Sequence, residues 1–284
     1  MSDGVFEAIS PEVGEIDESA LTEQMEADPD ATLATLARMT GATDVRLRAE
    51  AKRLAARLFI DLARTNRADA RGIGRIASIP YQPDGDLDLD TSADELLEAR
   101  AVRRAVSPEA LRVHAWTAPT TAWCLLVDRS GSMHGEPMAT AAMSAAVVAA
   151  RAERDYAVLS FGRDVIACTA MWEHHDTDEV IDRVLALRGH GTTDVAGALV
   201  AARQQLGASG AQRRVAILLS DCRATEPGDV IGAARSVDEL VIVAPEGDSA
   251  EAASLAESVG ARWTTASGPT SVVAALSRVL DRSP

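Results

Sequence analysis

The sequence predicts an α/β protein, a doubly wound and mostly parallel sheet with one antiparallel edge strand, helices on both faces and a mainly helical N-terminal extension. Two observations lead to this fold class. From residue 121 onward, short apolar runs alternate with helical segments, and such alternation favours parallel strands joined by right-handed crossovers. The apolar runs are also nearly continuous, which is typical of strands that are covered on both faces.

The elements of this sheet follow in a regular order. Strands are expected at 123–128, 156–161, 165–171, 214–221, 239–244 and 262–266, and helices at 139–152, 176–187, 194–206, 227–235, 250–259 and 271–279. A Gly-Arg-Asp turn joins the second strand to the third. We therefore expect that pair to be antiparallel.

The chain is expected to have three regions. Residues 1–30 contain ten Asp or Glu and no Lys or Arg, which indicates an acidic, disordered arm. Residues 31–117 are interpreted as a mainly helical region and linker, and 118–284 as the main domain. Helical spacing within 31–70 places five apolar residues on one face: Leu47, Ala51, Leu54, Leu58 and Leu62.

A break rich in glycine and proline over 72–85 interrupts the helical region. After it, Asp84–Asp90 alternates acid and leucine, which predicts a short exposed strand. Ser92 and Glu95 have the spacing of a capping box for a helix over 93–104. Residues 111–116 alternate as an edge strand would.

Composition excludes several classes of protein. The formal net charge is −15, which disfavours binding to nucleic acid or to anionic lipid and favours cations or a basic protein partner. Three cysteines form no disulfide framework or zinc motif. The basic start and apolar run of a secretory signal are missing, and no apolar stretch could span a bilayer. We therefore expect a soluble cytoplasmic protein.

Three polar loops are candidates to meet at the carboxyl ends of the strands, where open α/β sheets bind ligands. They are 128–133, 191–194 and 220–222. Asp128, Ser130 and Ser132 alternate around Gly131, so their oxygens can point the same way. A carboxylate with hydroxyls is a hard ligand set that suits Mg²⁺ or Mn²⁺ and leaves coordination positions open.

These loops resemble the metal-ion-dependent adhesion site of von Willebrand factor A (VWA) domains. Residues 125–133 resemble the first motif, 191–199 the second and 217–221 the third. The resemblance covers about 118–284 and implies a metal site of five ligands: Asp128, Ser130, Ser132, Thr193 and Asp221. Cys222 replaces a glycine that often follows the third motif. In the family, a partner's Asp or Glu then completes the coordination shell.

The region before the metal strand resembles bacterial cytoplasmic VWA proteins of the magnesium-chelatase D-subunit-like and MoxR-associated types. That resemblance implies a non-enzymatic adaptor for an AAA+ ATPase. The chain has no Gly-x-x-x-x-Gly-Lys loop, so the ATPase would be another polypeptide.

Two other functions remain open. One is a metal-dependent hydrolase or phosphotransferase using Asp128 or Ser130. Against it, no lysine follows Lys52, and there is no Gly-x-Ser-x-Gly elbow. The other is a purely structural domain with a vestigial site. The complete ligand set argues against this interpretation.

Further polar residues are given simpler interpretations. Residues 173–176, Glu-His-His-Asp, are interpreted as a solvated loop and not as a metal cluster. His134 and His190 are expected at the rim of the site, where they could modulate partner binding with pH. Cys222 is expected to be a buried thiol, with redox control as the alternative.

Overall fold

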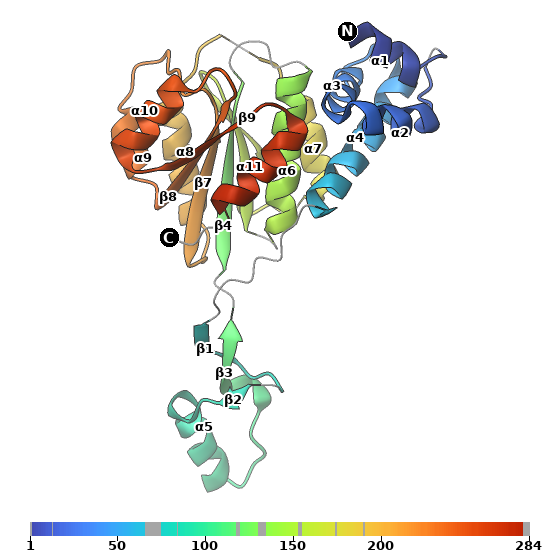
Figure 1. Cartoon of the computed structure of the whole chain (residues 1–284). Helices are drawn as coiled ribbons and strands as arrows, with labels where there is room; N and C mark the ends of the chain where they lie inside the picture. Colours follow the sequence, from blue (N-terminus) through green and yellow to red (C-terminus); the bar gives the residue numbers. More distant parts are fainter. Residues whose placement is uncertain are drawn as a thin grey trace. The chain divides into compact units, whose positions relative to one another are not determined.

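The structure is a computed structural model. It describes residues 2–12, 14–65, 75–83, 85–117, 120–129, 135–152, 155–173, 175–189 and 191–280. The chain divides into two compact units (Figure 1): a larger unit of Met1–Ala68 and Thr121–Pro284, and a smaller unit of Asp69–Thr120.

In the described part of the larger unit, a six-stranded sheet has the order β6-β5-β4-β7-β8-β9. The strands are β4 (Thr121–Asp128), β5 (Tyr156–Phe161), β6 (Val165–Thr169), β7 (Arg213–Leu219), β8 (Glu239–Pro245) and β9 (Arg262–Ala266). All neighbours are parallel except β5 and β6. This confirms the predicted fold class, including the antiparallel edge strand after the Gly-Arg-Asp turn.

Helices cover both faces of this sheet (Figure 1). On one face lie α6 (Glu136–Arg151), α7 (Thr177–Leu185) and α11 (Pro269–Leu280), and on the other lie α8 (Val195–Gly207), α9 (Val230–Arg235) and α10 (Ala250–Val259). Alternate residues of a strand face opposite sides. In β4, Leu125 and Val127 therefore belong to the first core, and Cys124 and Leu126 belong to the second.

The N-terminal helices extend the first core. They are α1 (Ser2–Ile9), α2 (Glu18–Ala27), α3 (Pro29–Met39) and α4 (Val45–Thr65), and α3 and α4 contact α6. The predicted apolar face of α4 is buried at Leu47, Ala51 and Leu54 and partly buried at Leu58 and Leu62. Because α6 lies between the sheet and these helices, nearly all of its Ala, Val and Met side chains are buried.

Two polar contacts connect the N-terminal helices to the rest of the larger unit. The Lys52 ammonium on α4 lies 3.4 Å from a carboxylate oxygen of Asp182 on α7. Asp30 on α3 accepts a hydrogen bond of 2.8 Å from the amide of Thr270, in the first turn of α11. This carboxylate meets the positive end of the α11 dipole.

The first thirty residues differ from the expected disordered arm. They contain α1 and α2, and the side chains of Ile9, Ile16 and Leu21 are buried. Acidic residues cap α2 and α3, since the Asp17 and Asp28 carboxylates accept amide hydrogen bonds at the starts of these two helices.

The smaller unit is a three-stranded antiparallel sheet with the order β1-β3-β2, made of β1 (Arg75–Pro80), β2 (Asp86–Leu87) and β3 (Arg112–Thr117). It also contains α5 (Leu89–Ala101) and a 3₁₀ turn, η1 (Pro108–Ala110). The edge-strand prediction for 111–116 is wrong, because part of the expected break forms β1 and places β3 in the centre. Among the described residues of the predicted strand over 84–90, Asp86 and Leu87 form β2, whereas Leu89 and Asp90 belong to α5.

The predicted capping box of α5 is also wrong. Asp88 is the N-cap, and its carboxylate accepts a hydrogen bond of 3.1 Å from the amide of Thr91. Ser92 instead lies buried inside the helix, where its hydroxyl accepts a 3.0 Å bond from the amide of Arg112. The helix therefore begins four residues earlier than the sequence pattern indicated.

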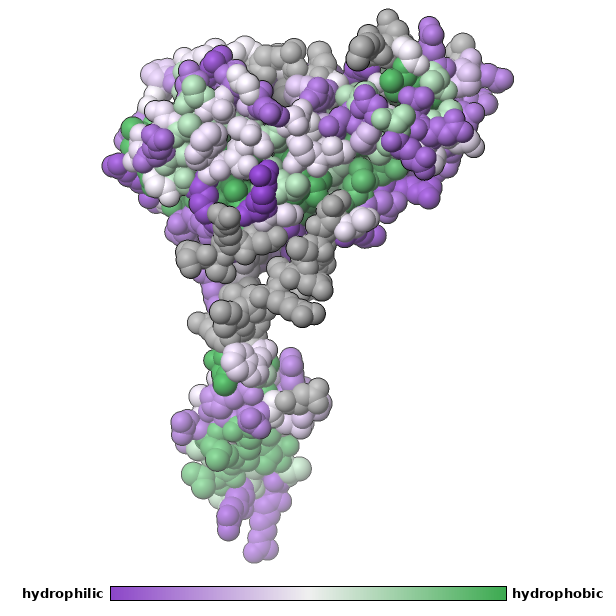
Figure 2. All heavy atoms as spheres, in the orientation of Figure 1, coloured by the Kyte–Doolittle hydropathy of each residue, from purple (hydrophilic) through white to green (hydrophobic). Residues whose placement is uncertain are grey.

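Figure 2 shows apolar side chains gathered on the smaller unit. The exposed large hydrophobic residues of this unit are Ile76, Tyr81, Leu87, Leu89, Leu97, Val102 and Trp116. No helix among the described residues combines the length and the apolarity needed to cross a bilayer.

Candidate metal centre

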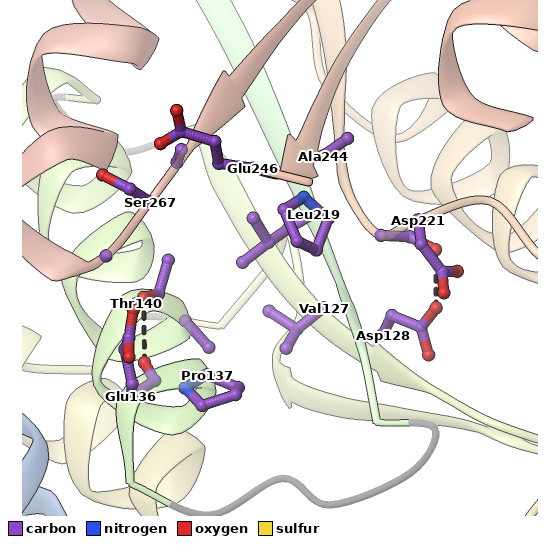
Figure 3. Close-up of a pocket in the computed structure, with 15 residues that line it drawn as sticks. Val127, Asp128, Glu136, Pro137, Thr140, Leu219, Asp221, Ala244, Glu246 and Ser267 are labelled. Atoms are coloured by element: carbon purple, nitrogen blue, oxygen red, sulfur yellow. Dashed lines mark hydrogen bonds between the residues drawn. The ribbon is translucent and has the colours of Figure 1, made fainter. Parts of the chain in front are cut away.

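Two of the predicted ligands leave adjacent strands at the same edge of the sheet. In the parallel pair β4–β7, Val127 lies opposite Leu219, so Asp128 and Ser220 follow at the same level. The Ser220 hydroxyl donates a 2.5 Å hydrogen bond to Asp128 Oδ2 and accepts one of 2.9 Å from the amide of Cys222. Asp221 follows Ser220 directly, and both aspartates line the same pocket (Figure 3).

Thr193 lies in the loop that leads into α8, and it is buried. Its amide donates a 2.7 Å hydrogen bond to the hydroxyl of Thr225, and its carbonyl accepts bonds from the amides of Thr225 and Glu226. Asp194 caps α8 by accepting a 2.8 Å bond from the amide of Gly197. These contacts fix the backbone of the second motif against the segment that follows β7.

The same loop also reaches the end of β5. The amide of Asp194 donates a 2.8 Å bond to the carbonyl of Gly162, and the amide of Arg129 donates a 2.8 Å bond to the carbonyl of Phe161. A Cβ on Gly162 would lie 3.3 Å from the carbonyl oxygen of Thr192. A larger residue at position 162 would therefore require the loop of the second motif to shift slightly.

The structure thus brings the five predicted ligands together in part. Asp128 and Asp221 share a pocket, and Thr193 is connected to their loops through backbone hydrogen bonds without being one of the residues that line that pocket. Ser130 and Ser132 lie outside the described residues, as do His134 and His190.

The donor chemistry fits a hard divalent cation. The groups at this edge are carboxylate and hydroxyl oxygens, which Mg²⁺ and Mn²⁺ prefer over nitrogen or sulfur ligands. Among the described residues, there is no cluster of three or more His, Cys, Asp or Glu that could hold a metal ion. The predicted ligand set relies on Ser and Thr hydroxyls as well as on its two aspartates.

Cys222 has an unusual backbone beside this site. Its φ is +65°, in the left-handed region where a side chain is disfavoured and glycine is not. Its side chain is buried. Burial, together with the charges of Asp221 and Asp128, raises the pKa of the Cys222 thiol to about 12.

The pocket beside the two aspartates has a volume of about 600 Å³. It extends across the carboxyl ends of β4, β7, β8 and β9 to the start of α6 (Figure 3). Glu136 and Glu246 line it and were not among the predicted site residues. Glu246 directly follows β8, so the rule that parallel strands end at one edge could have identified it.

The structure agrees with the interpretation of residues 173–176 as a solvated loop at Glu173 and Asp176, which are exposed, while His175 is partly buried and takes part in an ionic network. His175 lies 3.1 Å from Glu179 and 3.3 Å from Glu173, and Arg183 contacts both His175 and Glu179. Arg183 also donates a 2.9 Å bond to the carbonyl of Cys168. A hydrogen bond from the Ala170 amide, followed by contact with His175, lowers the pKa of Glu173. These residues form an ionic network that joins α7 to β6, while His174 lies outside the described residues.

Comparison with known proteins places the chain in a family. A family model described as "VWA domain containing CoxE-like protein" matches residues 31–252. No curated protein matches the sequence. Solved structures that match include a von Willebrand factor type A protein from Catenulispora acidiphila, at 16% identity and a TM-score of 0.43 over 57% of this chain and 42% of that one.

Two further structures show a similar level of likeness. Manganese-loaded TRAP protein from Plasmodium vivax has 17% identity and a TM-score of 0.44 over 57% of this chain and 74% of that one. An aerotolerance-related membrane protein from Bacteroides fragilis has 13% identity and a TM-score of 0.46 over 57% of this chain and 98% of that one. This chain therefore spans less than half of the Catenulispora protein and most of the Bacteroides one.

Proposed function

Since the chain belongs to the VWA-domain-containing CoxE-like family, we propose that it is a metal-dependent protein-binding module whose cation is held by Asp128, Ser130, Ser132, Thr193 and Asp221. VWA domains are generally non-catalytic interaction modules, and their sites bind divalent metal. The observation that carries the proposal here is the placement of Asp128 and Asp221 on one pocket, at the edge where β4 and β7 end.

The residues of such a site would have different roles. Asp128 and Asp221 supply negative charge, and the Ser220 hydroxyl orients the Asp128 carboxylate. The hydrogen bonds of Thr193 and Asp194 set the backbone from which the Thr193 hydroxyl would reach the ion. When bound, Mg²⁺ would offer an open coordination position to a partner's Asp or Glu. An ion pair with a bound cation in a partly dry pocket is stronger than one on an open surface.

We further propose that the partner is an AAA+ ATPase of the MoxR or chelatase type, for which this chain is a cytoplasmic adaptor. The support is the VWA fold combined with a sequence that has no nucleotide-binding Gly-x-x-x-x-Gly-Lys loop of its own. An adaptor of this kind would couple ATP hydrolysis in another polypeptide to a client protein.

Calorimetric titration with Mg²⁺ and with Mn²⁺ tests the metal site. Asp221→Asn is expected to weaken metal binding by at least about 10- to 100-fold, because a charged ligand oxygen is replaced by a neutral amide and even the loss of an outer-shell partner has an effect of that size. Glu257→Gln, on the exposed surface of α10, is the matched control and should bind like the wild type. Equal affinity in all three proteins would reject the site.

Capture of partners in Mg²⁺ and in EDTA tests the interaction. The captured proteins are identified by mass spectrometry, and an AAA+ ATPase is expected only in Mg²⁺ and not with Asp221→Asn. Capture that persists in EDTA would reject metal-mediated binding. Metal-dependent turnover of phosphoesters that Ser130→Ala abolishes would favour the hydrolase alternative.

A further inference from the structure

The pocket beside the proposed metal site carries more carboxylates than one bound divalent cation would neutralise. Of its described lining residues, Asp128, Glu136, Asp221 and Glu246 carry carboxylates, and none is Lys, Arg or His. A divalent ion held by Asp128 and Asp221 would balance that pair. The charges of Glu136 and Glu246 would remain.

The two glutamates lie across the pocket from the two aspartates (Figure 3). Glu136 is the first residue of α6, and Glu246 is the first residue after β8. Both are exposed, and within the described part of the chain neither is paired with a basic side chain. Between the two acidic sides, the pocket is walled by apolar side chains: Val127, Pro137, Leu219, Ala244, Pro245 and Ala266.

This arrangement selects among ligands that carry a carboxylate. A purely acidic segment on the metal would meet repulsion from Glu136 and Glu246. A basic side chain on the same segment would instead find two carboxylates, and the apolar walls would contact its aliphatic stem. The net charge of −15 attracts basic segments from a distance.

We propose that the partner binds through a segment in which a Lys or Arg lies close in sequence to the metal-binding Asp or Glu. The acidic side chain occupies the open position of the cation, and the basic head group lies between Glu136 and Glu246. The inference rests on the proposed metal site and adds the sequence chemistry of the partner to it.

Selection from a random peptide display library tests this directly. The whole chain in Mg²⁺ is the bait, in four forms: the wild type, Glu246→Gln, Glu136→Gln with Glu246→Gln, and the control Glu257→Gln. We expect the wild type and Glu257→Gln to enrich an acidic residue with a basic neighbour. The double variant should enrich the acidic residue alone, and Glu246→Gln keeps the test valid if Glu136→Gln disturbs α6.

Fluorescence anisotropy then measures how much the basic residue of a peptide adds to its affinity. A selected peptide and its counterpart with Gln in place of the basic residue are titrated with each protein. The wild type should prefer the basic peptide by about two- to fivefold at low salt, in line with exposed ion pairs. The double variant should bind the two peptides equally.

The outcomes separate this inference from the proposed function. Enrichment of acidic residues in Mg²⁺ without basic neighbours, or a basic preference that persists in the double variant, overturns the inference and leaves the metal site intact. Selection that shows no metal-dependent acidic preference overturns both.

Discussion

Cys222 combines a left-handed backbone with a side chain that glycine would not have. Replacing it by glycine should relieve roughly 1 kcal/mol of backbone strain. It should also lose roughly 1 kcal/mol of stabilisation from the buried side chain. Because the two effects oppose each other, Cys222→Gly is expected to change the free energy of unfolding by less than about 0.5 kcal/mol. Cys222→Val should lower it by about 2 kcal/mol, because a β-branched side chain fits this conformation worse.

Urea unfolding measures both variants. Cys168→Val is the control, since Cys168 is a buried cysteine in the extended backbone of β6. There a β-branched residue is well accommodated, and the loss should stay under about 1 kcal/mol. Equal losses at positions 168 and 222 would show that the left-handed backbone of Cys222 carries no strain.

Asp88 gives the smaller unit a stability that depends on pH. Hydrogen bonds from the side chains of Ser78 and Thr91, and then from the Thr91 amide, hold the pKa of Asp88 well below its usual value. The folded state therefore favours the carboxylate. The stability that the Asp88 carboxylate contributes is complete above the pKa of this group in the unfolded chain, about 3.9. This stability is lost as pH falls from there toward the lower pKa of Asp88 in the folded state.

Hydrogen exchange of α5 and β3 at pH 3 and pH 6 measures this dependence. In the wild type, the amides of α5 and β3 should be less protected from exchange at pH 3 than at pH 6. Asp88→Asn should be less protected at pH 6 and should show a weaker dependence on pH. A dependence of wild-type size in Asp88→Asn would assign the effect to other groups.

At the scale of the elements, one ionic cluster joins neighbouring strands at their amino ends. Glu239 at the start of β8 accepts bonds of 2.8 and 2.7 Å from Arg213 on β7 and also contacts Arg262 on β9. Arg213 lies 5.8 Å from the ring centroid of Trp123 on β4. Glu239 therefore connects two arginines on either side of its own strand.

Glu239→Gln is expected to lower the free energy of unfolding by about 1–3 kcal/mol, because a partly buried, charge-assisted pair is lost while both arginines stay in place. Urea unfolding at pH 7 measures the loss. Glu257→Gln, an exposed carboxylate, should fall within about 0.5 kcal/mol of the wild type. If both variants lost equal stability, the cluster would be a surface ion pair of little consequence.

The parallel sheet could be predicted from the sequence because its strands are local apolar runs. β5, β9 and α10 have the predicted bounds. In the smaller unit, α5 and β3 could be predicted within a few residues, but β1 could not. The segment that forms β1 is short, is flanked by Gly and Pro, and becomes a strand only by pairing with β3, which begins 32 residues after β1 ends. The helix start at Asp88 was missed because Ser92 and Glu95 offer an equally good local signal.

The candidate site could be predicted as a set of loops but not as a pocket. Asp128 and Asp221 were predicted from their motifs, and both line the pocket. Glu136 and Glu246 belong to no motif; the alignment of the strand ends brings Glu246 to the same cavity as the aspartates, and the start of α6 brings Glu136 there. Ser220 was visible as a neighbour of Asp221, but its bond to Asp128 depends on the register of β4 against β7.

At the scale of the whole larger unit, the N-terminal helices and the sheet share one core. Leu36 on α3 is fully buried in it. Leu36→Ala should lower the free energy of unfolding by about 2–4 kcal/mol. Native-state hydrogen exchange should show that β4 and β7 lose as much protection as α3, because the unit opens cooperatively.

Met39→Leu is a control at a buried position on the same helix, where a swap of similar volume should cost less than about 1.5 kcal/mol. Faster exchange confined to α1–α4 in Leu36→Ala would show that the N-terminal helices open as a separate unit.

The hydrogen bond between Asp30 and Thr270 joins residues that are 240 positions apart. During synthesis, α3 leaves the ribosome long before its partner on α11 exists. Until then, the part of α3 that contacts α11 stays uncovered, and a chain with such distant contacts folds slowly and exposes aggregation-prone intermediates. The packing of α3 is thus completed only after α11 has been made, and a nascent chain halted before residue 270 should be a good chaperone substrate.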